Sequence, residues 1–370
     1  MDTGSAPNRI GASPGKGREP MVGADSRPVT LVDVAAAAGV SVATVSKVLN
    51  GRSDVAPATR GRVERILAER GYRRPARGMP KPRTEYEEKE YQGKLIELLF
   101  HDAGTPWSAE MIRGVEETAR LARVGVVVSV LGSGARAGKR WLEDLVARQP
   151  IGAILALSRL SAADHRRLAA LGVPAILVDP DGELHAGLPS IGAGNWGGGM
   201  AATQHLIDLG HRRIGVITGP LRMLCCQARL AGYRAALENA GIPYDQRLVG
   251  HGEFTYPTAL AAALAMLEQP EPPTAIFAAN DVQALAVCAA AHQRGLRIPR
   301  DLSVVGFDDV PMSQWVTPPL TTVRQPIAEI GALAARSLLD HTGGTVDLPT
   351  GRVELATTMV VRESTAPPAL

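Results

Sequence analysis

The chain has 370 residues, of which 45% are hydrophobic and 4% aromatic, and its formal net charge is +3. This length fits a small head and a body of one or two domains, with a core mainly of Ala, Val, Leu and Ile. The longest apolar run, residues 124–131, is far too short to cross a membrane. Three cysteines without framework spacing exclude a disulfide scaffold and predict a reducing cytoplasm.

The charge is distributed unevenly along the chain. Residues 1–26 balance, residues 27–83 carry twelve Lys and Arg against four Asp and Glu, and residues 84–370 sum to −5. A basic head of this kind is typical of a protein that binds the phosphate backbone of nucleic acid. Residues 1–27 mix Gly, Pro, Ser and balanced charge without an apolar core, which predicts a disordered tail.

Residues 30–50 predict two short helices around a tight turn. Apolar residues recur at helical spacing up to Ala38, and the following Gly39 suits a left-handed helix end. Ser41 can cap a second helix over residues 42–49. This arrangement is a helix-turn-helix, whose second helix presents its first residues to base edges in the major groove. An ordinary helical hairpin is the alternative, and the coincident basic charge favours DNA binding.

A third helix is predicted over residues 59–70. Together these segments resemble the start of the lactose-repressor (LacI-type) family of bacterial transcription regulators. The residues that match the family pattern are Val29, Thr30, Asp33, Val34, Ala35, Ala38, Gly39, Val40, Ser41, Thr44, Val45, Ser46, Lys47, Val48, Leu49 and Asn50. The resemblance continues to about residue 362. It implies an all-α helix-turn-helix head (28–73), a linker or hinge (74–92) and a two-lobed α/β effector-binding and dimerisation body (93–365).

The second helix and its flanks supply the predicted DNA contacts. Lys47 is expected to reach a guanine edge, and Val42 and Ala43 to meet thymine methyl groups. The predicted phosphate contacts are Thr30, Thr44, Ser46 and Asn50. Because one head gives weak specificity, we expect the family's homodimer on a palindromic operator.

The hinge departs from the family pattern. Most members carry a short helix here that ends in a Leu wedged into the minor groove, whereas residues 73–82 hold three prolines and a glycine, which disfavour a helix. Two alternatives remain open. Met79 can wedge between base steps, or Arg73, Arg74 and Arg77 can lie extended in a narrow minor groove.

From residue 93 onward, short apolar runs alternate with helical patterns. The first group predicts strands at 95–100, 126–131, 153–157 and 175–178, with helices at 109–123, 139–148 and 162–171. The second group predicts strands at 214–218, 249–252, 275–278 and 303–306, with helices at 197–209, 227–240, 258–268 and 281–294. Such alternation predicts two parallel-sheet α/β lobes with a cleft between them.

The resemblance implies an architecture similar to periplasmic sugar-binding proteins, with several chain crossings between the lobes. On that basis, lobe one is expected at about 93–190 and 322–346. Lobe two is expected at about 191–321 and 347–365.

Polar and aromatic residues cluster near the predicted strand ends, where ligands of open α/β sheets bind. The predicted effector-binding residues are Trp107, Asp179, Arg229, Phe254, Asn280 and Asp308. Carboxylates, an amide, a guanidinium and two aromatic rings suit a polyhydroxylated ligand, and the matching family positions line the effector pocket. Five of the six residues also have a structural alternative, which is a helix or turn cap for Asn280 or Asp308, packing for the two aromatic residues, and a surface ion pair for Arg229.

These patterns predict a transcriptional repressor whose operator affinity is controlled by a sugar or oligosaccharide. The alternatives are a nucleobase-like corepressor, or a cytosolic sugar-binding protein without a DNA role. We expect no catalytic residues, cofactor, metal or membrane partner. The G-x-G-x-x-G at 192–197 is not followed by a strand ending in an acidic residue, as a dinucleotide-binding enzyme would require. The sequence also contains no G-x-S-x-G nucleophile elbow, no H-E-x-x-H zinc motif and no G-x-x-x-x-G-K-[ST] phosphate loop. The expected location is the bacterial cytoplasm, at the nucleoid.

Overall fold

The computed structural model describes residues 31–49, 55–69, 94–131, 137–157, 161–180, 188–344, 346–349 and 351–369. The chain divides into two compact units, residues 1–83 and 84–370, and each is described by itself. Within the described ranges, no helix is both long and apolar enough to span a bilayer.

The first unit contains the three predicted helices of the head. They are α1 (Leu31–Ala38), α2 (Val42–Leu49) and α3 (Pro57–Glu69). Gly39 has a φ of +61°, and Ser41 Oγ accepts a hydrogen bond from Thr44 N at 3.2 Å, so the turn has its left-handed glycine and its helix cap. The helices share an apolar core made of Val34, Ala35, Ala38, Val45, Val48, Val55 and Val63.

The second unit contains two six-stranded sheets, one in each lobe. The sheet of lobe one has the order β11 (Arg352–Leu355), β5 (Ser190–Ala193), β4 (Ala175–Val178), β3 (Gly152–Ala156), β1 (Leu95–Phe100), β2 (Gly125–Val130). The sheet of lobe two has the order β12 (Thr358–Val360), β10 (Thr321–Arg324), β9 (Ser303–Asp308), β8 (Ala275–Ala278), β6 (Ile214–Thr218), β7 (Val249–His251). Neighbouring strands run parallel except β10 and β12, which are antiparallel.

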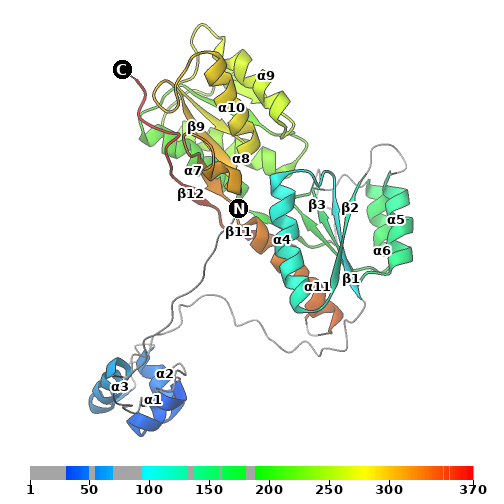
Figure 1. Ribbon diagram of the computed structural model, residues 1–370, viewed down its shortest axis with the longest axis vertical. Helices are drawn as coiled ribbons and strands as arrows, with labels where there is room; N and C mark the ends of the chain where they lie inside the picture. Colours follow the sequence, from blue (N-terminus) through cyan, green and yellow to red (C-terminus); the bar gives the residue numbers. More distant parts are fainter. Residues whose placement is uncertain are drawn as a thin grey trace, which may run out of the picture. The chain divides into compact units, whose positions relative to one another are not determined.

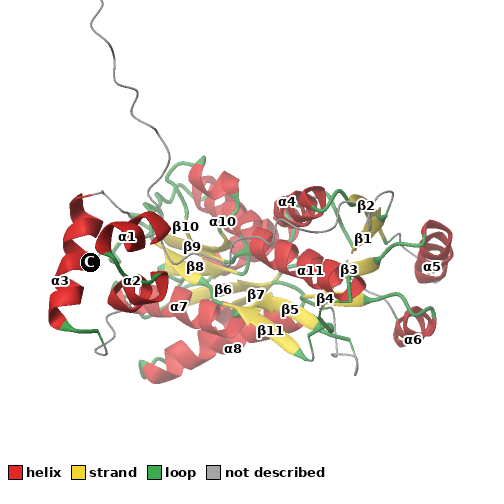
Figure 2. Cartoon of the chain, turned by 90° about the horizontal axis from the view of Figure 1, so that it is seen from below, coloured by secondary structure: helices red, strands yellow, loops and turns green. Residues whose placement is uncertain are grey.

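Helices cover both faces of each sheet, as parallel strands require. In lobe one they are α4 (Pro106–Leu121) and α11 (Ile327–Thr342) on one face, and α5 (Ala137–Arg148) and α6 (Ala162–Ala170) on the other (Figure 1). In lobe two they are α7 (Asn195–Asp208) and α8 (Leu224–Asn239) on one face, and α9 (Tyr256–Leu267) and α10 (Asp281–Gln293) on the other. Figure 2 shows β6, β8 and β9 between α10 and the pair formed by α7 and α8.

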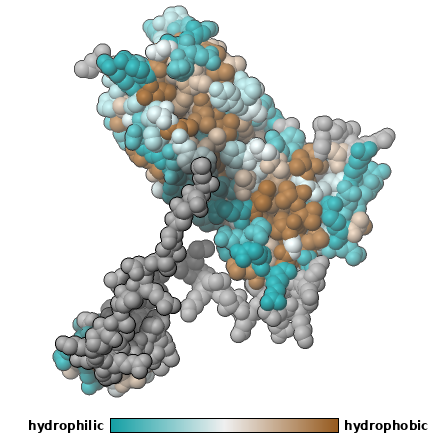
Figure 3. Space-filling view, in the orientation of Figure 1, coloured by the Kyte–Doolittle hydropathy of each residue, from teal (hydrophilic) through white to brown (hydrophobic). Residues whose placement is uncertain are grey.

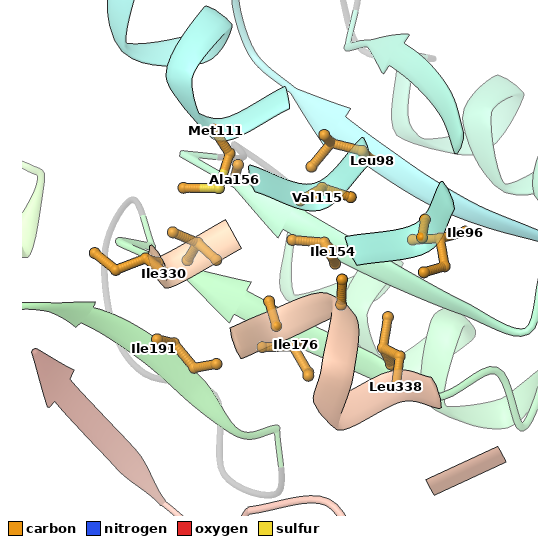
Figure 4. Packing of buried hydrophobic residues seen from close by; sticks show 14 of the residues in the cluster. Ile96, Leu98, Met111, Val115, Ile154, Ala156, Ile176, Ile191, Ile330 and Leu338 are labelled. Atoms are coloured by element: carbon orange, nitrogen blue, oxygen red, sulfur yellow. The ribbon is translucent and has the colours of Figure 1, made fainter. Parts of the chain in front are cut away.

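The largest core lies between the lobe-one sheet and its helices α4 and α11. Figure 4 shows Ile96, Leu98 and Ile154 of the sheet facing Met111 and Val115 of α4, and all five side chains are fully buried. Such close apolar packing fixes the ends of β1 and β4, which carry the lobe-one side of the cleft.

The predicted lobe boundaries are wrong at three points, because strand pairing rather than sequence alternation decides them. β5 pairs with β4, so lobe one continues to Ala193 before the chain crosses. β10 pairs with β9 and belongs to lobe two. β11 pairs with β5, so residues 352–355 return to lobe one before β12 joins lobe two. These short strands carry no alternating pattern that marks them in the sequence.

Candidate functional site

The outward face of α2 carries the described residues of the predicted DNA interface. Val45 and Val48 are buried, whereas Val42 is 41% exposed and Lys47 is also exposed. Ser46 is half-buried on the same helix. Val42 and Lys47 are therefore on the exposed side of α2, and Val45 and Val48 are on its core side.

The remaining predicted DNA contacts are described only in part. Thr44 is half-buried, and its Oγ1 lies 2.9 Å from Ser41 Oγ, so the hydroxyl belongs to the helix cap. Ala43 lies in α2. The residues outside the described ranges are Thr30, Asn50, Arg73, Arg74, Arg77 and Met79.

Residues of both lobes line a cavity of about 440 Å³. All six predicted effector residues line it, although they come from distant parts of the sequence. Lobe one contributes Trp107 and Asp179, and lobe two contributes the other four. A cavity of this size, with apolar walls and a few convergent polar groups, is typical of a small-molecule site.

Asp179 provides the charged group on the lobe-one side. It follows β4 directly, has a φ of +42° and is 3% exposed. Its Oδ1 lies 3.8 Å from Arg352 Nη2 and accepts no hydrogen bond from any described residue. Burial raises the pKa of this carboxyl, and the charges of Arg229 and Arg352 oppose the rise. The strained backbone and unsatisfied oxygen are typical of a binding position.

Arg229 lies on α8 and is 4% exposed. Its Nε donates to Asn195 Oδ1 at 2.8 Å, its Nη1 donates to the carbonyl of Ala279, and its guanidinium stacks 3.7 Å from the Phe307 ring centroid. The surface ion-pair alternative is wrong, because this arginine is buried and oriented by three elements. Hydrogen bonds and stacking hold the planar group in one orientation.

Asp308 ends β9 with a φ of +114° and is 6% exposed. Its Oδ1 accepts a hydrogen bond from Gln325 Nε2 at 2.6 Å and lies 3.8 Å from Arg229 Nη1. Burial raises the pKa of Asp308 to about 7, while Arg229 and the Gln325 hydrogen bond lower it and Asp179 raises it further. The cavity wall therefore holds two buried carboxyls, Asp179 and Asp308, and the charge of Arg229 lowers the pKa of both.

Three residues combine a structural role with a place in the cavity wall. Asn280 caps α10, because its side chain accepts from Gln283 N at 2.8 Å, and it also lines the cavity. Trp107 is 8% exposed and packs edge-on against Phe100. Phe254, with a φ of +61°, is half-buried in the wall. The structural alternatives and the ligand-lining positions therefore coexist.

Several cavity residues were not predicted. They are His101, Asp102, Arg222, Met223, Cys225, Glu253 and Gln325, among others. His101 and Asp102 follow β1 as Asp179 follows β4, so the same strand-end rule could have found them. Gln325 follows β10, a strand that the sequence pattern missed. Cys225 and Cys226 are free thiols in the first turn of α8, with their Sγ atoms 3.9 Å apart.

Comparison with known proteins agrees with the architecture. Residues 30–75 match the family described as bacterial regulatory proteins, lacI family, and residues 203–365 match a periplasmic binding protein-like domain. The HTH-type transcriptional regulator CelR of Thermobifida fusca is 37% identical over 91% of this chain and 98% of its own length.

Two solved structures are similar over nearly the whole chain. A transcriptional regulator CelR–cellobiose complex has a TM-score of 0.69 and 34% identity, covering 91% of this chain and all of that one. The lac repressor dimer bound to operator and the anti-inducer ONPF has a TM-score of 0.66 and 30% identity, covering 92% and 100%. With its helix-turn-helix head and two-lobed body, this chain belongs to the lacI family of bacterial transcription regulators.

Proposed function

We propose that this protein is a homodimeric repressor that binds a palindromic operator through α2 and changes its operator affinity when a sugar or oligosaccharide occupies the cleft. The observation that carries the proposal is the cavity whose wall combines Asp179, Arg229 and Asp308 with the aromatic side chains of Trp107 and Phe254. The CelR relative, described as a cellobiose complex, supports a sugar ligand. The site of action is the chromosome in the bacterial cytoplasm.

Coupling follows from the contribution of both lobes to one cavity. A ligand that contacts Asp179 on lobe one and Arg229 on lobe two binds one lobe arrangement better than another. It shifts the population toward that arrangement, and where DNA also distinguishes the arrangements, operator affinity changes by at most the ligand's difference in affinity.

The edge of the lobe-one sheet supports the homodimer. β2 is a six-residue edge strand on which Val128 is 41% and Val130 is 55% exposed. Figure 3 shows apolar side chains gathered on this face of lobe one, between α4 and α5. Proteins normally cover or charge such an edge, and the lac repressor structure described as a dimer on operator supports a second copy as the cover.

The DNA role is tested by fluorescence anisotropy on the cognate palindrome and on variants with single symmetric base changes. Lys47→Ala is expected to weaken cognate binding by about 1–3 kcal/mol and to relax preference at one symmetric position. Lys139→Ala, which removes an exposed lysine of α5, is the matched control and should leave binding unchanged. Equal affinity of wild type and Lys47→Ala for cognate and altered DNA would refute the assigned role.

A further inference from the structure

Two buried hydrogen-bond acceptors in the cavity wall lack a partner within the described part of the chain. Asp179 Oδ1 and Gln325 Oε1 are buried and accept no hydrogen bond from any described residue, and both residues line the cavity. Gln325 is 3% exposed and its amide nitrogen is used, because it donates to Asp308 Oδ1 at 2.6 Å. A buried acceptor without a partner costs free energy until a ligand supplies a donor.

The donors of the wall are engaged by the protein itself only in part, and His101 Nδ1 is also buried without a hydrogen-bond partner among the described residues. Arg229 uses one N–H on Asn195 and one on the carbonyl of Ala279, out of the five in its guanidinium. Asn280 donates to the carbonyl of Phe254 at 3.4 Å. A ligand hydroxyl can accept from Arg229 and donate to Asp179, whereas an ionised phosphate or carboxylate can only accept.

Charge points in the same direction. The carboxylates that line the cavity are Asp102, Asp179, Glu253 and Asp308, and the guanidinium groups that line it are Arg222 and Arg229. At the rim, Arg222 lies 3.3 Å from Glu253. Behind Asp179, Arg352 also bonds Glu354 at 2.7 Å and is not part of the cavity wall. An anionic ligand group in this cavity therefore faces more carboxyl groups than guanidinium groups, and like charges repel strongly at low dielectric.

We propose that Asp179 and Gln325 are specificity-determining residues that demand hydrogen-bond donors from the effector, so the cleft admits an uncharged glycoside and rejects its phosphorylated or carboxylated counterpart. This proposal rests on the proposed sugar-responsive function. Gln325 lies where the chain leaves β10 and crosses to α11, so the residue that reads the ligand's donor also lies on a connection between the lobes.

The test measures thermal stabilisation and titration calorimetry of the full chain, without DNA, using glucose, ribose, maltose and cellobiose and the phosphate ester of each. We expect the stabilising ligands to be neutral members, each binding at least a hundredfold more tightly than its ester. Asp179→Asn replaces an acceptor with a group that can also donate, and it should narrow that ratio at least tenfold. Asp208→Asn makes the same charge change on the exposed face of α7 and should preserve the ratio.

Gln325→Glu is a second variant with the opposite expected effect. It adds a carboxylate to the cavity wall and should increase the ratio of the ester's dissociation constant to that of the neutral sugar. A phosphorylated sugar that binds as tightly as its neutral partner overturns the proposal. So does an unchanged ratio in folded Asp179→Asn, or stabilisation by none of the eight probes. If neutral sugars bind selectively but leave operator affinity unchanged, the donor requirement stands and the proposed repressor function fails.

Discussion

The two lobes share one topology and differ at their edges and in what they bring to the cleft. Their sheets have equivalent strand orders. One edge of the lobe-one sheet is the six-residue β2 with exposed valines, whereas the corresponding edge of the lobe-two sheet is the three-residue β7, which contains Gly250 and His251. Lobe two in turn supplies most of the charged and amide groups of the cavity. Under the proposed function, lobe one carries the edge for association, and lobe two carries most of the groups that recognise the ligand.

A packing feature common to both lobes gives the largest expected effect. An ideal Cβ at Gly114 would lie 1.9 Å from the carbonyl oxygen of Ala328, and one at Gly232 would lie 2.1 Å from that of Trp196. Each glycine lets two helices approach closely, and in lobe two this contact seats α8 and therefore Arg229. Backbone atoms cannot move aside as a flexible side chain can.

We therefore expect Gly114→Val and Gly232→Val each to destabilise the protein by more than about 3 kcal/mol, lowering Tm by about 6–12 °C. Gly197→Ala in α7 is the matched control, because a Cβ at Gly197 would have no heavy atom within 4 Å. This variant should stabilise the folded protein by about 0.5–1 kcal/mol. Calorimetric unfolding distinguishes these cases. A wild-type Tm for either valine variant would contradict the close-packing account.

A substitution in the edge strand β2 is expected to have the next largest effect, and it tests directly whether the lobe-one edge forms the dimer. Val128→Lys places a charge in the apolar edge of β2 and should raise the dimer dissociation constant about a hundredfold, which corresponds to about 2.7 kcal/mol. Val361→Lys is the control, since Val361 is 60% exposed in the segment after β12. Sedimentation velocity across a concentration series measures both. A Val128→Lys protein that dimerises like wild type would place the dimer elsewhere.

The raised pKa of Asp308, about 7, predicts a pH-dependent effector affinity. A hydroxyl that donates to the ionised carboxylate binds that form better, so affinity should fall by up to about tenfold per pH unit below 7. Burial raises the pKa of Asp179 as well, which acts in the same direction. In the unliganded protein, the native state binds more protons than the unfolded chain between about pH 4 and 7, so stability from Asp308 is lost as the pH rises through that range.

Titration calorimetry at pH 6, 7 and 8 checks this dependence. Asp308→Asn should flatten the profile of whatever affinity remains, and it should raise apo stability at pH 8 because no buried charge has to form. An affinity that is constant or improves toward pH 6 would show that the ligand does not use the ionised carboxylate.

The smallest effect separates the two roles of Asn280. Asn280→Ala loses the cap of α10 and should cost about 1 kcal/mol, whereas Asn280→Ser keeps a capping oxygen and should retain most of the stability. If Asn280 also binds the effector, both variants should weaken ligand binding alike. Normal binding by the serine variant would limit Asn280 to the cap.

Much of this architecture was predictable because long helices and buried strands carry strong periodic patterns. The rule that ligands bind at the carboxyl ends of parallel strands identified Asp179 and Asp308, since each lies at the end of a strand that the sequence pattern predicts. Gln325 was missed because the Thr-rich β10 before it lacks a continuous apolar run and gains its place only by pairing with β9. Cys225 was missed because α8 begins before its helical pattern becomes regular.

The central claim is that a ligand in the inter-lobe cleft controls a DNA-binding head. Its most direct test is the anisotropy of the full-length protein on labelled operator, with and without a saturating neutral sugar that stabilises it. We predict salt-dependent binding to the palindrome and a change of at least about fivefold in its dissociation constant on sugar addition. Failure to bind any double-stranded fragment at modest ionic strength, or an operator affinity that is identical with the cleft filled, would contradict the account.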